Sequence, residues 1–316
     1  MTTLDIHTIA FPTAELRDAV LARVPDIKEL GLEFPVWSHE HQDDGVSKAD
    51  IDMVVLPYLN GQKTAPLLDE LPNLKVVHTQ STGYDIVADL IGQVQVANAS
   101  GVHAAATAEL AIGLTLTSLR GIDESARDMT DHRWRHLRHP GLADRKVLLV
   151  GVGGIGKAIT DRLLPFEVDL TRVATRARED EYGTVHGIDE LPQLLPTAEV
   201  VILITPLTAT TRGLVDAEFL AALPDKALVV NVARGKVVDT DALVAELESG
   251  RLRAALDVVD PEPLPADHPL WSTPNTLITP HVGGDTEAFE PRIVKLLAEQ
   301  ILRIQKGQPL LNVIEE

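Results

Sequence analysis

The feature that most constrains the fold is a glycine-rich turn between an apolar segment and a helical one. Residues 146–163 read KVLLVGVGGIGKAITDRL and contain Gly151, Gly153 and Gly156 in the pattern GxGxxG. The first glycine permits a tight turn, the second lets the backbone approach a pyrophosphate, and the third lets helix and strand pack closely. The start of the helix adds free N–H groups and a positive dipole end. The stretch predicts a dinucleotide-binding unit, with a ligand-free glycine turn as the alternative.

Short apolar runs that alternate with helical patterns extend this unit into a parallel sheet. The expected strands are 146–150, 172–175, 200–205, 227–232, 254–259 and 276–280. An earlier series has expected strands at 6–11, 52–58, 74–80 and 94–99, with helices at 13–24 and 64–71. Further helical patterns cover 103–129 and 288–308. Together with a length of 316 residues, the two series predict two α/β domains.

Composition excludes several classes of protein. The formal net charge is −19, from 28 basic and 47 acidic residues, and such a chain repels nucleic acid and anionic membranes. The absence of cysteine excludes disulfides, thiolate metal sites and cysteine nucleophiles. The N-terminus lacks a secretory pattern, and no apolar run approaches the roughly 18 residues that a membrane span needs. We expect a cytoplasmic protein without nucleic-acid or membrane partners.

Polar side chains follow three neighbouring strands of the second series. Arg234 follows the strand at 227–232, and His281 follows the last strand. The loop after the strand between them holds three carboxylates, Asp257, Asp260 and Glu262. Because the carboxyl ends of parallel strands meet at one edge, these groups are expected to lie together where such sheets bind ligands. An arginine there can clamp a carboxylate, and a carboxylate can orient a histidine that donates a proton. Each residue alone also fits an ordinary loop position, so the inference depends on their common placement.

The chain resembles the D-isomer-specific 2-hydroxyacid dehydrogenases. The matching segments follow that family's order and spacing: GVGGIG, PLTATTRGLVD (206–216), NVARGKVVD (231–239), LDVVDPEPLP (256–265) and TPHVGG (279–284). The resemblance implies an α/β fold of two doubly wound parallel-sheet domains. A Rossmann dinucleotide-binding domain, 101–285, is inserted in a flavodoxin-like catalytic domain formed by 1–100 and 286–316. Helices at 103–120 and 286–305 would act as hinges for domain closure.

The resemblance also implies an NAD(P)-dependent 2-hydroxyacid oxidoreductase and assigns its residues. Arg234, Glu262 and His281 are the implied catalytic residues. Substrate binding falls to Thr82 and Gly83, in the segment STGYD, together with Arg234 and His281. Trp134 matches an arm that reaches a partner's active site, so a homodimer is expected. The implied cofactor-binding residues are Thr107, Gly151, Gly153, Gly154, Ile155, Gly156, Thr175, Arg176, Arg178, Thr205, Pro206, Thr211, Val232, Ala233, Arg234, Asp257, His281 and Gly283.

The substrate expected from the sequence is a small 2-oxoacid of the glyoxylate or hydroxypyruvate type. Family members that handle phosphorylated substrates tend to carry basic residues in a loop that reads LPYLN here, at 56–60, without arginine. The chain also stops at residue 316 without an appended regulatory domain. An NAD-using enzyme of the phosphoglycerate dehydrogenase type, an enzyme of a non-carbon substrate such as phosphite, and a non-catalytic dinucleotide-sensing module are the alternatives. No metal is expected, because Arg234 and His281 already supply the electrophile and the acid.

The stretch RVATRARED, residues 172–180, bears on the choice of cofactor. It lies about 20 residues beyond the glycine turn, where an NAD-binding fold normally offers an acidic residue to the ribose. Thr175 stands there instead, and Arg176 and Arg178 follow. A carboxylate would repel a 2′-phosphate, whereas these side chains can bind one. We therefore expect NADP(H) to be preferred and NAD(H) to be possible. A merely charged loop is the alternative, since the acidic residues 179–181 reduce the positive field.

Overall fold

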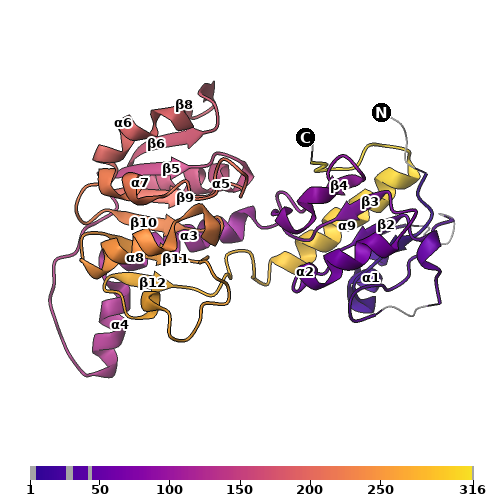
Figure 1. Ribbon diagram of the computed structural model, residues 1–316, viewed down its shortest axis with the longest axis horizontal. Helices are drawn as coiled ribbons and strands as arrows, with labels where there is room; N and C mark the ends of the chain where they lie inside the picture. Colours follow the sequence, from indigo (N-terminus) through magenta and orange to yellow (C-terminus); the bar gives the residue numbers. More distant parts are fainter. Residues whose placement is uncertain (1–4, 26–30, 42–44, 315–316) are drawn as a thin grey trace. The chain divides into compact units, whose positions relative to one another are not determined.

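The computed structural model describes residues 5–25, 31–41 and 45–314. The chain divides into two compact units, which we describe separately (Figure 1). Unit 1 comprises Met1–His103 and Glu287–Glu316, and unit 2 comprises Ala104–Thr286. Each unit is a parallel β-sheet with helices on it, which confirms the predicted α/β class.

The sheet of unit 1 has four parallel strands in the order β1-β2-β3-β4. The strands are β1 (Ile9–Ala10), β2 (Met53–Val55), β3 (Val76–His78) and β4 (Gln95–Ala97). Parallel bridges join Thr8 to Glu33 and Phe11 to Val36, so a short further segment lies beyond β1. Counted as a strand, it makes the order 2-1-3-4-5, which is the doubly wound order of flavodoxin-like sheets. The sequence patterns predicted the four strands but not this edge segment.

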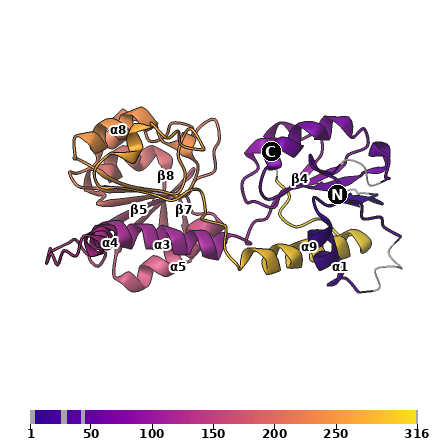
Figure 2. The ribbon, with the colours of Figure 1, turned by 90° about the horizontal axis from the view of Figure 1, so that it is seen from below.

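Alternate strand residues of unit 1 are buried against opposite layers. On one face, Val55 and Val76 pack with α1 (Ala14–Leu21) and α9 (Phe289–Gln305), which lie together in Figure 2. On the other face, Val54 and Val77 pack with the short 3₁₀ segments η3 (Ala65–Glu70) and η4 (Asp85–Leu90). The short helix α2 (Gly61–Thr64) directly precedes η3 in the chain. The single helix predicted at 64–71 is therefore wrong, since a short helix and a 3₁₀ segment take its place.

The sheet of unit 2 has eight strands in the order β12-β11-β10-β9-β5-β6-β8-β7, all parallel except β7. The strands are β5 (Lys146–Val150), β6 (Asp169–Ala174), β7 (Arg178–Asp180), β8 (Gly183–Gly187), β9 (Val200–Leu203), β10 (Leu228–Asn231), β11 (Arg253–Leu256) and β12 (Thr276–Ile278). The chain leaves β5 toward one edge and returns at β9 toward the other edge. This reversal is the topological switch point at which doubly wound sheets bind ligands.

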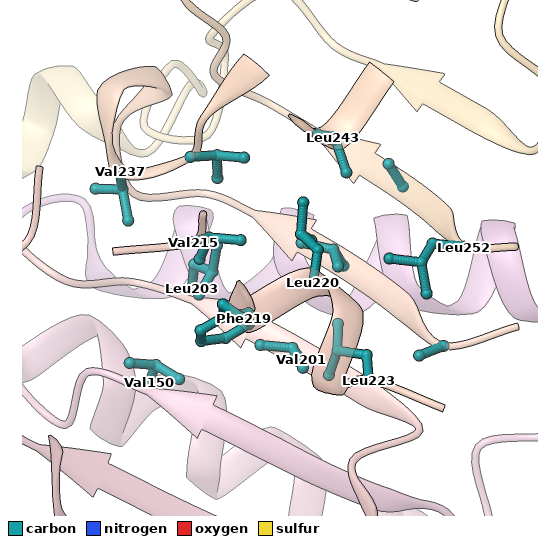
Figure 3. Close-up of a cluster of buried hydrophobic side chains, with 14 of the residues drawn as sticks. Val150, Val201, Leu203, Val215, Phe219, Leu220, Leu223, Val237, Leu243 and Leu252 are labelled. Carbon is teal, nitrogen blue, oxygen red and sulfur yellow. The ribbon is translucent and has the colours of Figure 1, made fainter. Parts of the chain in front are cut away.

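Helices cover both faces of the unit 2 sheet. On one face lie α3 (Ala104–Arg120) and α5 (Gly154–Leu163), against alternate residues such as Leu149 and Ile202. The other face carries α6 (Leu191–Leu194), α7 (Ala217–Ala222) and α8 (Thr240–Glu248). Figure 3 shows part of this second core, in which Phe219 and Leu220 of α7 lie against Val201 and Leu203 of β9.

Two features of unit 2 differ from the sequence prediction. The single helix expected at 103–129 is broken at Gly121, which has a left-handed φ of +60° between α3 and α4 (Ile122–Thr130). A β-carbon on Gly121 would lie 2.3 Å from the ring of His139, so this ring packs on the break. The second feature is the β7–β8 hairpin, which the sequence patterns did not predict.

Candidate active site

The glycine turn lies at the switch point of unit 2. Gly151 follows β5 with a φ of +115°, and a β-carbon there would lie 2.6 Å from the carbonyl oxygen of Ile204, which follows β9. A β-carbon on Gly156 would lie 2.1 Å from the carbonyl oxygen of Gly151. Gly153 and Gly154, by contrast, are exposed, and their β-carbons would meet nothing within 4 Å. The turn is therefore tightly packed inward and open outward at the N-terminus of α5, which fits a pyrophosphate.

The predicted cofactor residues lie at the carboxyl ends of several strands. Thr175 and Arg176 follow β6 and are exposed, while Thr205 and Pro206 follow β9. The Thr205 hydroxyl is buried without a hydrogen-bond partner among the described residues. Thr211 instead closes its own loop, since its hydroxyl donates to the Pro206 carbonyl at 2.6 Å. Other predicted residues line the same edge: Ile155 in the first turn of α5, Val232, Ala233 and Arg234 after β10, Asp257 after β11, and His281 after β12.

Asp257 organises the loop that carries the histidine. Its carboxylate is 3% exposed and accepts hydrogen bonds from the Thr279 hydroxyl at 2.6 Å and from the N–H groups of Val282 and Gly283 at 2.9 and 2.8 Å. Its carbonyl accepts from the His281 N–H at 2.8 Å. Thr107, in the first turn of α3, lies beside Gly283. The contacts of Asp257 within this structure therefore hold the loop in place.

His281 forms a pair with Glu262. Its Nδ1 lies 2.8 Å from Glu262 Oε2, and the other carboxylate oxygen of Glu262 accepts from the Val259 N–H at 2.9 Å. With Nδ1 directed at the carboxylate, Nε2 is the ring atom left to exchange a proton with a ligand. Burial raises the pKa of Glu262, but hydrogen bonds from His281 and Val259 outweigh it, and the pKa is lowered overall. Glu262 is therefore ionised at neutral pH and able to stabilise an imidazolium.

Arg234 lies in the turn after β10, and its charge also lowers the pKa of Glu262. Asn231 shapes this turn, because its amide donates to the Arg234 carbonyl at 3.1 Å and its oxygen accepts from the Ala233 N–H at 3.0 Å. A β-carbon on Gly235 would lie 1.8 Å from the Val259 carbonyl oxygen, so the turn packs directly on the loop of Glu262. Sequence reasoning missed Asn231 and Gly235, although both stand in the segment NVARG.

In unit 1, the predicted substrate loop follows β3. The Ser81 hydroxyl donates to the Gly83 carbonyl at 2.6 Å, and the Asn98 amide donates to the Thr82 carbonyl at 2.7 Å. Among the described residues, neither the Thr82 nor the Gly83 N–H donates to another protein group. The Thr82 hydroxyl is likewise buried without a partner there. Two adjacent open N–H groups suit an anion such as a carboxylate.

A segment near the C-terminus holds this loop through Asn98. The Asn98 N–H donates to the Asn312 carbonyl at 3.1 Å, and the Asn312 amide donates to the carbonyls of Asn98 and Ser100 at 3.2 and 3.1 Å. Gln300, on α9, exchanges two hydrogen bonds of 2.9 Å with the backbone of Leu311. We call residues 311–314 the C-terminal strap. Sequence reasoning missed this arrangement entirely.

Trp134 stands apart from these groups, in the segment between α4 and β5. Its side chain is 99% exposed, and the neighbouring Arg135 pairs with Asp128 at 2.5 Å. Across the described ranges, no three histidine or acidic side chains gather as metal ligands would. No helix in those ranges has the length and apolar character of a membrane span.

Comparisons with known proteins identify the family of the chain. The family described as "D-isomer specific 2-hydroxyacid dehydrogenase, NAD binding domain" matches residues 112–283. The chain is 34% identical to a glyoxylate reductase of Thermofilum pendens, over 80% of this chain and 78% of that protein. It is also 34% identical to the human glyoxylate reductase/hydroxypyruvate reductase, over 75% and 76% of the two chains.

A solved structure extends the likeness to the whole fold. The D-isomer specific 2-hydroxyacid dehydrogenase of Xanthobacter autotrophicus, in complex with NADPH and MES, aligns with a TM-score of 0.84 over 98% of both chains, at 29% identity. The chain therefore belongs to the D-isomer-specific 2-hydroxyacid dehydrogenase family of NAD(P)-dependent oxidoreductases.

Proposed function

We propose that the protein reduces a small 2-oxoacid, of the glyoxylate or hydroxypyruvate type, with NADPH. The observation that carries the proposal is the 2.8 Å pairing of His281 Nδ1 with Glu262, next to the turn of Arg234. It leaves the imidazole Nε2 as the acid, at the sheet edge that also carries Arg234 and the glycine turn. Unit 2 serves as the dinucleotide-binding domain, near 101–285, and unit 1 as the catalytic domain of 1–100 and 286–316.

The proposed mechanism assigns one task to each group. A nicotinamide cofactor, when bound at the glycine turn, would supply the hydride that reduces the ketone carbon. Arg234 binds the substrate carboxylate and polarises the ketone, and the open N–H groups of Thr82 and Gly83 bind the carboxylate. Protonated His281 donates its Nε2 proton to the developing alkoxide, and Glu262 stabilises the imidazolium and fixes the ring. The protein thus contributes positioning and electrostatic stabilisation.

The substrate class is supported by the relatives and by one loop. The two relatives described above are named as reductases of glyoxylate, one of them also of hydroxypyruvate. The loop at 56–60, LPYLN, offers no cation for a phosphate. A panel of 2-oxoacids, followed by the absorbance of reduced cofactor, tests this choice. Highest kcat/KM on a phosphorylated 2-oxoacid would contradict it.

The choice of NADPH is supported by the end of β6. Thr175 and Arg176 follow this strand directly, Arg178 begins β7, and all three are exposed. Within the described part of the chain, Arg176 forms no ion pair that would compete with a ligand. A solved relative is complexed with NADPH. Arg176→Ala should raise the KM for NADPH and leave that for NADH unchanged.

The acid role of His281 is tested by His281→Ala. Turnover should fall by about a hundredfold or more, since general acid catalysis contributes on that order. The dissociation constant of NADPH, measured by fluorescence titration, should stay close to that of the wild type. An unchanged kcat would contradict the assignment of His281 as the general acid.

A homodimer is part of the proposal, with Trp134 in the contacting arm. Its almost complete exposure leaves the side chain accessible to a second copy of the chain. Sedimentation of wild type and Trp134→Ala tests it, and a wild type that sediments as a monomer contradicts it. Cell fractionation tests the cytoplasmic location expected from the sequence.

A further inference from the structure

Arg172, on β6, is a buried cation bound to one acidic residue. Only 4% of its side chain is exposed, and its two terminal nitrogens meet the two carboxylate oxygens of Asp180 at 2.8 and 2.7 Å. It also donates to the Gly183 carbonyl at 3.0 Å, and the Tyr182 N–H donates to Asp180 at 2.8 Å. Hydrogen bonds from Arg172 lower the pKa of Asp180, so this carboxylate is charged, and both of its oxygens already accept hydrogen bonds from Arg172.

Strand register places a second arginine beside the same carboxylate. Arg172 of β6 and Arg178 of β7 both pair with Val185 of β8, one from each side. Laterally paired residues point to the same face of a sheet, and residues two apart on a strand do so as well. Arg172, Arg178 and Asp180 therefore share one face. The charge of Arg178 also lowers the pKa of Asp180, as expected for a close neighbour.

The other two acidic residues of this stretch are engaged elsewhere. Glu181 pairs with Lys157 of α5 at 2.5 Å. Glu179 accepts from the Thr184 hydroxyl at 2.8 Å and lies on the opposite face of β7 from Arg178. Asp180 is thus the acidic side chain best placed to capture Arg178, and Arg172 already holds it.

We propose that Arg172 is a positioning residue for recognition of the 2′-phosphate of NADPH, and the proposal rests on the function proposed above. By occupying Asp180, it leaves the guanidinium of Arg178 available, with Arg176, to the phosphate. Without Arg172, Asp180 would pair with Arg178 and place a negative charge beside the phosphate. In this arrangement Arg176 and Arg178 bind the 2′-phosphate directly. Arg172 does not touch the cofactor, but it keeps Asp180 from pairing with Arg178.

The test measures binding of 2′,5′-ADP and 5′-AMP by calorimetry, which separates the 2′-phosphate from the rest of the nucleotide. Arg172→Met should weaken 2′,5′-ADP by about tenfold, the loss of one charge-assisted hydrogen bond, with 5′-AMP unchanged. Adding Asp180→Asn to this variant should restore 2′,5′-ADP binding to within about threefold of the wild type, because the competing carboxylate is gone.

Asp180→Asn alone is the matched control, because it removes the carboxylate with Arg172 in place. Its affinity for 2′,5′-ADP should stay within about threefold of the wild type, or rise. Because Asp180→Asn can be measured on its own, it can contradict the inference even where Arg172→Met does not fold. A tenfold loss in Asp180→Asn, or a double variant as weak as Arg172→Met, would overturn the inference alone. A wild type that binds both nucleotides equally would overturn the NADPH assignment as well.

Discussion

A single methyl group on Gly235 should disable the site. Its β-carbon would lie 1.8 Å from the Val259 carbonyl oxygen and 2.1 Å from the carbonyl carbon, whereas ordinary contact begins at 3.4 Å. The turn and the loop must therefore separate by about 1.6 Å, and both are backbone, so no side chain can yield. The loop carries Glu262 and the turn carries Arg234. A displacement of this size moves Arg234 and Glu262 away from the positions at which they act together with His281.

We expect Gly235→Ala to lower kcat/KM by about a hundredfold, the usual effect of a misplacement near 1 Å. The free energy of unfolding should fall by about 1–3 kcal/mol, as in other overpacked interiors. Steady-state kinetics with glyoxylate and NADPH, and urea unfolding, measure the two effects.

Gly113→Ala is the matched control for Gly235→Ala. It lies within α3, is exposed, and its β-carbon would meet nothing within 4 Å. Kinetics should be unchanged, and the unfolding free energy should rise by about 0.5–1 kcal/mol because alanine favours a helix. Wild-type kcat/KM in Gly235→Ala would refute the packing argument.

Three further predictions concern other parts of the chain. Gly156→Ala, with its β-carbon 2.1 Å from a backbone oxygen, should abolish NADPH binding in a fluorescence titration, and retained affinity would contradict the tight turn. Asn312→Gly keeps the φ of +56° but loses two hydrogen bonds of the C-terminal strap, so the KM for the 2-oxoacid should rise about threefold to tenfold while the dissociation constant of NADPH stays constant. His78 is fully buried, and burial lowers its pKa from 6.5 to about 4. The unfolded chain therefore binds the proton more readily, and stability should fall by about 3 kcal/mol as the pH drops from 6.5 to 4. In urea unfolding between pH 6.5 and 4, His78→Leu should not show this loss of stability. Parallel profiles of unfolding free energy against pH for wild type and variant would contradict the role of His78.

The parts of the fold that sequence predicted are those with short-range causes. The glycine turn depends on backbone conformation at Gly151 and Gly156, and strands buried on both faces are continuous apolar runs. Residues that follow parallel strands then share an edge by geometry alone. This is why Arg234, His281 and a carboxylate of the loop at 257–262 could be expected together without coordinates. The choice of Glu262 among these carboxylates came from the family resemblance.

What sequence could not predict depends on side-chain contacts that hydrophobic periodicity does not encode. The break at Gly121 depends on the ring of His139, and the residues on either side of it form helix well, so the pattern continues through it. The β7–β8 hairpin buries only Val185 among its apolar residues, and Arg172 is buried by virtue of Asp180. A run of charged residues such as that of β7 predicts a loop, because the sequence does not show which contacts would hold those side chains in a sheet.

Unit 1 is built from two segments of the chain that are separated by unit 2, and this determines the order in which its parts are synthesised. Helix α9 covers one face of the β1–β4 sheet with Ile293, Leu297 and Ile301, yet all of unit 2 lies between β4 and α9 in the sequence. Because the ribosome delivers the chain from its N-terminus, unit 2 emerges whole while that face of unit 1 has α1 but still lacks α9. The nascent chain thus carries a partly uncovered apolar sheet for the time needed to translate some 180 residues, about 10–40 s at roughly 5–20 residues per second. During this interval the protein most needs a chaperone. The interval ends when α9 is synthesised and covers the rest of that face.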